Sequence, residues 1–332
     1  MTRLIRWAAA LFGVALLVFA SIGAWFSYSV FGDTSHPAGE TEVVIPRGAS
    51  FDDVARQLAQ SGVIGNAFAF RILARVRHAD ANVRAGAYRF EPHQTQSGVL
   101  QSLLSGGAQV AAWVTIPEGF TAGQIAERLQ EAGAGNAAEL KRAFLTAPLE
   151  VDGTRVTGLE GYLFPNTYLV PTDASADQIE KQLTDEFFKQ LPADAPARAR
   201  MLHVTVPQGV IVASLIEREA KADVDRPLIG GVIYNRLRLG MPLQIDATIE
   251  YALPEHKAEL SFADLKISSP YNTYLHDGLP PTPIANPGRP SLEAAFHPAK
   301  TDDLYYVYCG NGRHVFAKTM PEHQANVARC LH

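Results

Sequence analysis

Two glutamates close an apolar segment in the second half of the chain. The segment PQGVIVASLIEREAK runs from Pro207 to Lys221. It carries no charged residue before Glu217, and Glu219 follows two positions later. Apolar surroundings raise the pKa of a carboxyl group, because they disfavour its charged form. A carboxyl with a raised pKa can give and take a proton near neutral pH, as a general acid must. The segment therefore predicts acid–base chemistry.

The spacing of the two glutamates separates them on the predicted helix. The stretch from Val210 to Ile216 is apolar on every side, which predicts a helix that runs through the protein interior. At 100° per residue, Glu217 shares its side with Ala213 and Ser214, whereas Glu219 shares its side with larger apolar residues. Small residues leave space for a substrate, so Glu217 is the predicted acid.

The end of this helix and the start of the next allow a second interpretation. Lys221 stands four positions after Glu217, and a Glu–Lys pair at this spacing is typical of a solvated helix end. The next helix is predicted from Arg226 to Gly240, with Asp225 as its N-cap and the glycine as its stop. The residues alone leave open whether Glu217 is an acid or half of a surface ion pair.

Charge and composition exclude several classes of ligand. The 332 residues carry a formal net charge of -5, with Lys+Arg 29 against Asp+Glu 34, so no basic surface is available for nucleic acid. The 10 His residues are scattered, and no spacing typical of metal ligands occurs among them. The sequence predicts no nucleic acid partner, no metal and no other cofactor.

The N-terminus has the composition of a membrane anchor. No charged residue occurs from Trp7 to Phe26, and the apolar character continues to Phe31. About 20 helical residues cross a hydrocarbon core of roughly 30 Å. Arg3 and Arg6 precede the run, so the positive-inside rule predicts a short cytoplasmic tail and an exported body. The rival interpretation is a cleaved signal peptide, whose apolar stretch is usually shorter.

Two segments in the front half repeat one pattern, VVIPRGASFDDVARQLAQSGVI and VTIPEGFTAGQIAERLQEAGAG. In each copy a β-branched run ends at Ile-Pro-x-Gly, and Ser50 or Thr121 opens a helix as in a capping box. Gly62 and Gly133 stop the two helices. The repeat predicts a duplicated strand-turn-helix unit that resembles, weakly, the LysM glycan-binding module.

The remaining elements are predicted from local patterns. Residues 159–171 read as strand and turn, and 174–191 as an amphipathic helix. The tail LYYVYCGNGRHVFA predicts a β-hairpin around Gly310-Asn311-Gly312, followed by a helix from Pro321. Cys309 and Cys330 are the two cysteines, and the sequence leaves open whether they form a disulfide.

The predicted fold is therefore α+β, with a transmembrane helix, a duplicated LysM-like front part and a mostly helical catalytic part that ends in a hairpin. The predicted segments are 1–6 as cytoplasmic tail, 7–31 as anchor, 32–40 as linker, 41–110 as LysM-like module, 111–205 as second strand-helix unit and connection, and 206–332 as catalytic domain.

Five long motifs follow one another in the second half: VASLIEREA, YNRLRLGMPLQIDATIEYAL, SPYNTYLHDGLPPTPIANPG, SLEAAFHPAKTDDLYYV and HVFAKT. With the single N-terminal membrane helix, they resemble the endolytic murein transglycosylase family, also called YceG-like. The resemblance implies that the acid is the first Glu of a Ser-x-x-Glu-x-Glu stretch, which is Glu217 here. Family members commonly have Glu-Lys-Glu-Thr where this chain has Glu-Arg-Glu-Ala, so one neighbouring hydroxyl is missing.

The same resemblance gives the polar residues around Glu217 a role as sugar contacts. Amide, carboxyl and phenol groups suit hydrogen bonding and stacking on N-acetylated sugars. Alternatively, these groups satisfy the backbone of a rigid Pro/Gly loop. The candidates are Ser214, Glu219, Asn235, Gln244, Asp246, Tyr271, Asn272 and Tyr274.

The implied reaction is scission of the β-1,4 bond between N-acetylmuramic acid and N-acetylglucosamine in nascent peptidoglycan, with 1,6-anhydro-muramyl ends. The implied location is the bacterial inner membrane with the catalytic part in the periplasm, where the protein terminates glycan elongation beside peptidoglycan synthases. One rival is a hydrolase that uses Glu217 with a second carboxylate such as Asp246 or Glu219. The other is a non-catalytic, membrane-anchored glycan-binding scaffold.

Overall fold

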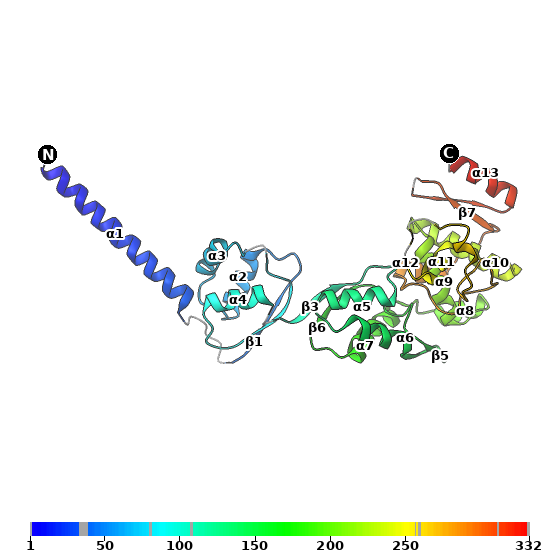
Figure 1. The fold of residues 1–332 in the computed structure, drawn as a ribbon, viewed down its shortest axis with the longest axis horizontal. Helices are drawn as coiled ribbons and strands as arrows, with labels where there is room; N and C mark the ends of the chain where they lie inside the picture. Colours follow the sequence, from blue (N-terminus) through cyan, green and yellow to red (C-terminus); the bar gives the residue numbers. More distant parts are fainter. Residues whose placement is uncertain are drawn as a thin grey trace. The chain divides into compact units, whose positions relative to one another are not determined.

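The computed structural model describes residues 2–32, 39–79, 82–106, 109–255, 257, 260–310 and 312–330 (Figure 1). It contains two compact units, one of residues 1–113 with 169–173 and one of residues 114–168 with 174–332. The predicted boundary between residues 205 and 206 lies inside the second unit. Most of the predicted linker, residues 33–38, lies outside the described part of the chain.

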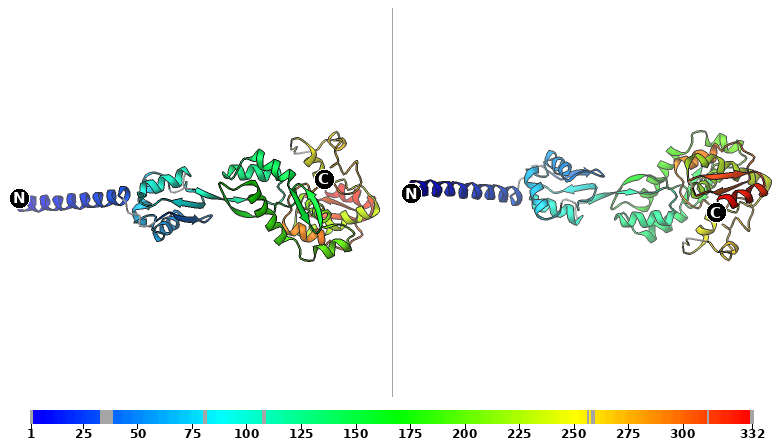
Figure 2. Two further views of the ribbon diagram at one scale, coloured as in Figure 1. Left: turned by 90° about the horizontal axis from the view of Figure 1, so that it is seen from below. Right: turned by 90° about the horizontal axis from the view of Figure 1, so that it is seen from above.

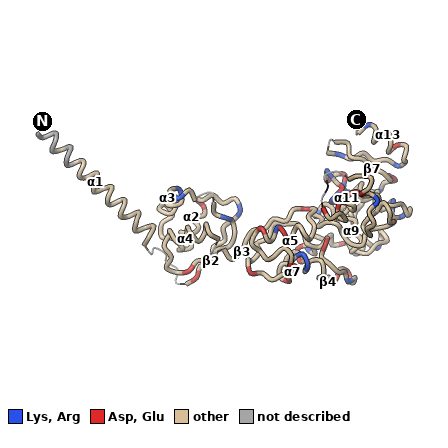
Figure 3. Tube along the Cα trace, viewed as in Figure 1, with Lys and Arg blue, Asp and Glu red and all other residues tan. Residues whose placement is uncertain are grey.

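The N-terminal helix α1 (Thr2–Phe31) matches the predicted apolar run. Its stretch Leu11–Phe31 is long and apolar enough to cross a membrane. In Figure 3 the trace over this stretch carries neither blue nor red. The last turn differs, because Val30 is fully buried and Phe26 packs against the core of the first unit.

The first unit begins strand-helix-helix-strand. Its elements are β1 (Thr41–Ile45), α2 (Phe51–Gln60), α3 (Ala67–Val76), β2 (Gly86–Phe90), α4 (Gln96–Ser105) and β3 (Gln109–Thr115). Strands β1 and β2 pair antiparallel, and the apolar sides of the helices enclose a core with Phe70, Tyr88 and Phe90. The capping box predicted at Ser50 is present, with Asp53 as its partner.

The second copy of the repeat opens the second unit. The elements are α5 (Ala122–Glu131), α6 (Ala137–Thr146), β4 (Pro148–Val151), β5 (Thr154–Thr157) and α7 (Ala176–Gln190), while most of the strand β6 (Thr167–Pro171) belongs to the first unit. Thr121 and Gln124 form the predicted capping box. Gly62 and Gly133 follow the two helices at φ +76° and +82°, in the left-handed region that favours glycine. The main sheet has the order β1-β2-β3-β6.

Helices dominate the rest of the second unit. They are α8 (Ala195–Met201), α9 (Val206–Glu219), η1 (Asp223–Asp225), α10 (Arg226–Leu239), α11 (Asp246–Ala252), η2 (Asp264–Lys266) and α12 (Arg289–Phe296). As predicted, α9 is buried on all sides from Val210 to Ile216, against α10, α11 and α12. A Cβ at Gly209 would come within 2.5 Å of the Phe296 ring, so a glycine here lets α12 approach closely.

The C-terminal segment is the predicted hairpin with its closing helix. Strands β7 (Tyr305–Tyr308) and β8 (His314–Ala317) pair antiparallel, and α13 (Met320–Cys330) lies beside both, as Figures 1 and 2 show. Cys309 and Cys330 are joined by a disulfide with Cα atoms 4.4 Å apart. The predicted turn residue Asn311 lies outside the described residues.

The start of α10 corrects one prediction. Asp225 stands at the N-cap position, but its side chain makes no capping hydrogen bond. Its carboxylate instead accepts hydrogen bonds from Arg313 Nε at 2.9 Å and from the backbone N–H of His314 at 2.7 Å. The hairpin takes the carboxylate that the helix start was expected to use, so Asp225 fixes β8 to α10.

Candidate active site

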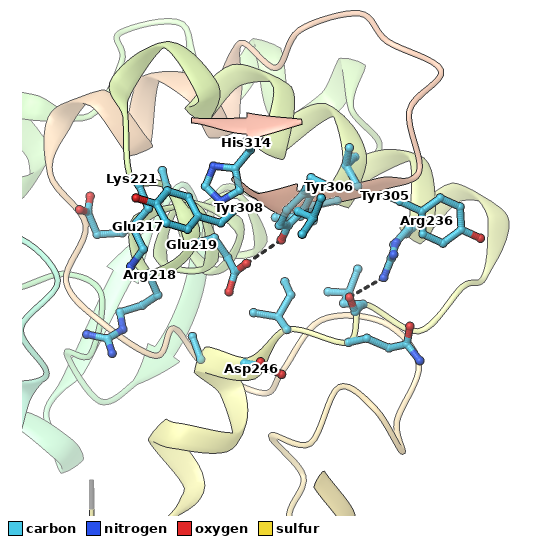
Figure 4. Close-up of a pocket in the computed structure, with 18 of the residues that line it drawn as sticks. Glu217, Arg218, Glu219, Lys221, Arg236, Asp246, Tyr305, Tyr306, Tyr308 and His314 are labelled. Atoms are coloured by element: carbon cyan, nitrogen blue, oxygen red, sulfur yellow. Dashed lines mark hydrogen bonds between the residues drawn. The ribbon is translucent and has the colours of Figure 1, made fainter. Parts of the chain in front are cut away.

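A cavity of about 770 Å³ opens where α9 ends, within the second unit (Figure 4). Its wall is formed by the end of α9, the middle of α10, the segment 243–250 and the hairpin β7–β8, with Glu118 and Gly119, Tyr274 and the first turn of α13 at its margins. The residues that matter below are Glu118, Glu217, Arg218, Glu219, Lys221, Arg236, Gln244, Asp246, Tyr274, Tyr306 and His314. Charged and phenolic groups therefore meet at the end of an otherwise apolar helix.

Glu219 presents its carboxylate to this cavity. In Figure 4 the carboxylate points away from α9 toward Tyr306, whose hydroxyl donates a hydrogen bond of 2.9 Å to Glu219 Oε2. Burial raises the pKa of Glu219 to about 7, and the negative charge of Asp246 acts in the same direction, while the Tyr306 hydrogen bond lowers it. Glu219 therefore has the environment and the pKa of a group that exchanges a proton near neutral pH.

A second carboxylate lines the same cavity. Asp246 stands at the first position of α11, and the hydroxyl of Tyr274 donates a hydrogen bond to its Oδ1. Burial is the largest cause that raises the pKa of Tyr274, followed by this bond to Asp246, so the phenol keeps its proton. Gln244 lies on the same wall, in a left-handed conformation with φ +53°. An acid, a carboxylate and an amide therefore share one cavity.

Glu217 is held by the protein itself. Its Oε2 accepts from Arg226 at 3.3 Å and from the backbone N–H of Gly288 at 3.0 Å. The Glu217 and Arg226 side chains are only 7% and 10% exposed. Arg226 also donates to Asp223 and to Ser291. The surface pair of Glu217 with Lys221 is thus replaced by a buried ion pair that joins the end of α9 to α10 and α12.

A third carboxylate stands near this pair. Glu118 lies in the Ile-Pro-Glu-Gly turn before α5, against the backbone of Gly288. Burial and the negative charge of Glu217 raise the pKa of Glu118, whereas the charge of Arg226 lowers it. The positive charge of Arg226 therefore interacts favourably with both Glu118 and Glu217, and it stabilises this corner of the cavity.

Four of the predicted sugar contacts have hydrogen-bond partners within the protein. Ser214 is fully buried and donates to Ile211 O within α9, and Asn272 is fully buried and donates to two backbone carbonyls. Asn235 donates to the carbonyls of residues 301 and 303. The hydroxyl of Tyr271 lies 2.8 Å from that of Thr282. None of these four lines the cavity of Glu219.

The raised pKa alone does not identify the acid, as Glu160 shows. Burial also raises the pKa of Glu160 to about 7. This carboxylate lies outside the cavity of Glu219 and accepts hydrogen bonds from the N–H of Ala122, from Asn286 Nδ2 and from the Tyr251 hydroxyl. Its donors are all supplied by the protein, so it fixes the start of α5. Glu219 differs from Glu160, because within the described part of the chain it has a single donor, Tyr306, and it lines the cavity.

The hairpin residues of the site were missed from the sequence. Tyr306, Tyr308 and His314 reach the cavity from β7 and β8, almost ninety residues after α9. The run YYVY contains the signal, because period-two alternation sends Tyr306 and Tyr308 to one side of the strand. No group of three or more His, Cys, Asp or Glu suited to a metal occurs among the described residues.

Comparisons with known proteins agree with one another. The sequence model of the YceG-like family matches residues 43–329. A Bacillus subtilis protein named "Endolytic murein transglycosylase" is 36% identical over 84% of this chain and 81% of its own length. A Streptococcus pneumoniae D39 protein of the same name is 30% identical over 96% of this chain, which spans only 64% of that relative.

A solved structure also resembles this chain. The crystal structure of a yceG-like protein from Listeria monocytogenes superposes with a TM-score of 0.60 and 34% sequence identity, covering 87% of this chain and 99% of that one. The similarity therefore extends over most of the chain.

Proposed function

Because this chain belongs to the YceG-like family, we propose that it is an endolytic murein transglycosylase, a lyase that cuts the glycan strands of peptidoglycan. The relatives of that name supply the substrate class. The cavity beside Glu219 supplies the chemistry, since a buried carboxyl with a pKa near 7 suits a single group that acts first as acid and then as base.

We assign the acid to Glu219 and not to Glu217, which the motif comparison had favoured. Glu219 lines the cavity, and Tyr306 is its one hydrogen-bond donor among the residues that the structure describes. Glu217 is committed to Arg226 and to the N–H of Gly288. Protonating Glu217 would weaken a buried ion pair, so proton transfer there would disturb the packing of α9 against α12.

The reaction then needs no second protein acid. Protonated Glu219 gives its proton to the oxygen of the β-1,4 bond between N-acetylmuramic acid and N-acetylglucosamine as the bond breaks. The resulting carboxylate takes the proton of the muramyl 6-hydroxyl, and that oxygen closes on C1 to give a 1,6-anhydro ring. The proton returns to Glu219, no water is consumed, and the enzyme is regenerated.

Asp246 is the second carboxylate of the proposed reaction and stabilises its transition state. Its negative charge faces the position where positive charge develops on the sugar ring, and the hydrogen bond from Tyr274 fixes its orientation. We propose Gln244, Asp246 and Tyr274 as substrate contacts, while Ser214, Asn235 and Asn272 hold the surrounding backbone in place and Tyr271 pairs with the Thr282 side chain. The rival hydrolase would use Asp246 to activate a water molecule.

We propose further that α1 is an uncleaved inner-membrane anchor, that the body is periplasmic, and that residues 41–110 form a LysM-like module that binds glycan. The strand-helix-helix-strand order of the first unit supports the module. Cutting of nascent strands would then end their elongation, and peptidoglycan synthases would be neighbours of the enzyme.

The decisive experiment is a mass spectrum of the glycans that the purified full-length protein releases from uncross-linked strands. A lytic transglycosylase yields ends lighter by one water than those of a hydrolase. Only hydrated reducing ends would favour the hydrolase. Release of no fragments at all, by protein that binds the same strands, would favour the scaffold. Glu219→Gln protein serves as the inactive control.

A further inference from the structure

The packing of α1 fixes where the membrane surface must lie. Val30 is fully buried and Ser29 nearly so, and Phe26 packs on the core of the first unit. The side of the last turn that carries Ser29 and Val30 therefore faces protein and not lipid. The apolar helix from Trp7 to Trp25 rises about 28 Å at 1.5 Å per residue, close to the thickness of a hydrocarbon core. The membrane surface on the C-terminal side of α1 accordingly lies near Trp25, within about one turn of the first unit.

Helix α3 lies at that level. Both α3 and α4 contact α1 within the first unit. Because the part of α1 that is buried in the first unit is the Ser29 and Val30 side of its last turn, we infer that α3 packs just outside the hydrocarbon core. The side chains on the outer face of a helix in that position contact the lipid headgroups.

The outer face of α3 combines apolar and basic side chains. Its inner face is buried through Ala69, Phe70, Leu73 and Ala74. On the opposite face, within an arc of about 140° at 100° per residue, the helix carries three apolar and two basic side chains. Those five residues are Phe68, Arg71, Ile72, Arg75 and Val76.

This face is largely exposed, and no residue of the described part of the chain is seen to cover its apolar groups. Phe68 is 56% and Val76 70% exposed, on the side of α3 opposite its buried face. Arg71 lies over the Phe68 ring at 5.9 Å and forms a weak ion pair with Asp52 at 3.5 Å. Arg75 is exposed on the same face. Phenyl and guanidinium groups side by side are typical of helices that lie in a membrane interface.

We propose that the outer face of α3 docks onto the membrane surface at the C-terminal end of α1, with Phe68 and Val76 inserted among the lipids and Arg71 and Arg75 bound to anionic headgroups. The inference rests on the proposed role of α1 as an uncleaved anchor. Two contacts, α1 and α3, then hold the first unit on the membrane instead of one.

The test uses the full-length protein in nanodiscs of anionic lipid whose acyl chains carry bromine, which quenches nearby tryptophan. Trp7, Trp25 and Trp113 are replaced by Phe, and one reporter is introduced as Phe68→Trp or Val76→Trp. The matched control is Val44→Trp, at an exposed position of β1 in the same unit. We expect brominated lipid to reduce the α3 reporters' emission at least about two-fold and to leave the control unchanged.

The outcomes separate docking from anchoring. A chain that retains Trp25 alone reports whether α1 is in the membrane. If Trp25 is quenched while Phe68→Trp and Val76→Trp are not, docking is refuted and the anchor stands. An unquenched Trp25 refutes the anchor itself. Equal quenching of Val44→Trp and Phe68→Trp also overturns the proposal, because contact would not be specific to α3.

The charged part of the surface is tested separately. Replacing Arg71 and Arg75 by Ala should reduce the quenching of Phe68→Trp in anionic nanodiscs. Added salt should also reduce this quenching in the protein that keeps both arginines. In nanodiscs of zwitterionic lipid the double substitution should change little. Quenching that is the same with and without the arginines, and the same in anionic and zwitterionic lipid, would contradict the headgroup contact.

Discussion

Exchanging one carboxyl for an amide should have opposite consequences at two neighbouring positions of α9. Glu219→Gln removes the proton that the reaction needs, and we expect activity to fall by several orders of magnitude. Glu217→Gln leaves the proton of Glu219 in place but breaks the ion pair with Arg226. We therefore expect this substitution to lower stability much more than activity. The two substitutions are nearly identical in size, so each controls for the other.

The magnitudes follow from the two environments. The pKa of Glu219 rises from 4.5 to about 7, which corresponds to at most about 3 kcal/mol of cost for the charged form in the folded state. Because folding raises the pKa of Glu219, the protonated side chain stabilises the folded state fully below pH 4.5. This stabilisation is lost as the pH rises to about 7. Glu219→Gln should therefore stabilise the protein by about 1–3 kcal/mol at pH 8 and hardly at all at pH 4.

Glu217→Gln has the reverse sign. Removing one partner of a buried pair typically costs about 3–5 kcal/mol, since the other charge remains buried. Glutamine can still accept hydrogen bonds from Gly288 and Arg226, so about 2–4 kcal/mol is expected here. For a unit of this size, each kcal/mol moves the melting temperature by about 2–4 °C.

The assay is thermal unfolding of the detergent-solubilised full-length protein by near-ultraviolet circular dichroism at pH 5 and pH 8, beside the mass spectrum of released glycans. We expect Glu219→Gln to melt higher at pH 8 without activity, and Glu217→Gln to melt lower while folded protein still cuts. Near-normal turnover by Glu219→Gln, or an inactive Glu217→Gln protein with unchanged melting, would refute the assignment and restore Glu217 as the acid.

Three further changes test the surroundings of the site. Tyr306→Phe removes a donor that lowers the pKa of Glu219, so the alkaline limb of the kcat profile should move to higher pH while kcat falls about ten-fold; an unshifted limb would argue against the contact. Reducing the Cys309–Cys330 bond, which spans 21 residues, should cost about 3 kcal/mol in urea unfolding and lower activity through the hairpin; equal urea midpoints with and without reductant would contradict this. Gly209→Ala should destabilise by about 1–3 kcal/mol because its Cβ would meet a ring of α12, whereas Gly123→Ala, with 3.5 Å to its nearest neighbour, should be neutral or stabilising; similar melting temperatures for both would refute the packing argument.

The elements were predictable where local chemistry decides them. The capping boxes at Ser50 and Thr121, the glycine stops and the buried α9 follow from side chains within a few residues of one another. The hairpin with its helix followed from turn and alternation signals. The disulfide did not, because pairing two cysteines requires a distance that the sequence lacks, and the structure supplies 4.4 Å between their Cα atoms.

The site was harder to predict, because it depends on which partner each polar group finds. Helical periodicity predicted that Glu217 shares its side of the helix with small residues and Glu219 with large ones. Because α9 is an α-helix from Val206 to Glu219, this division of its sides is kept. Neither reveals that Arg226 closes on Glu217 or that Tyr306 reaches Glu219 from the hairpin. Asn235 and Asn272 likewise have the composition of a sugar contact, yet each binds backbone carbonyls.

The strand order β1-β2-β3-β6 has a consequence for how the chain becomes folded. The first unit is closed by residues 169–173, so 55 residues of the second unit are synthesised before its last strand exists. Until β6 emerges, β3 is an open edge that another chain could pair with. A fragment that ends near residue 113 would keep that open edge permanently, and it should associate with itself where the whole chain does not. Neither unit can therefore be excised by a single cut, and the two units complete their folding in an interleaved rather than a sequential order.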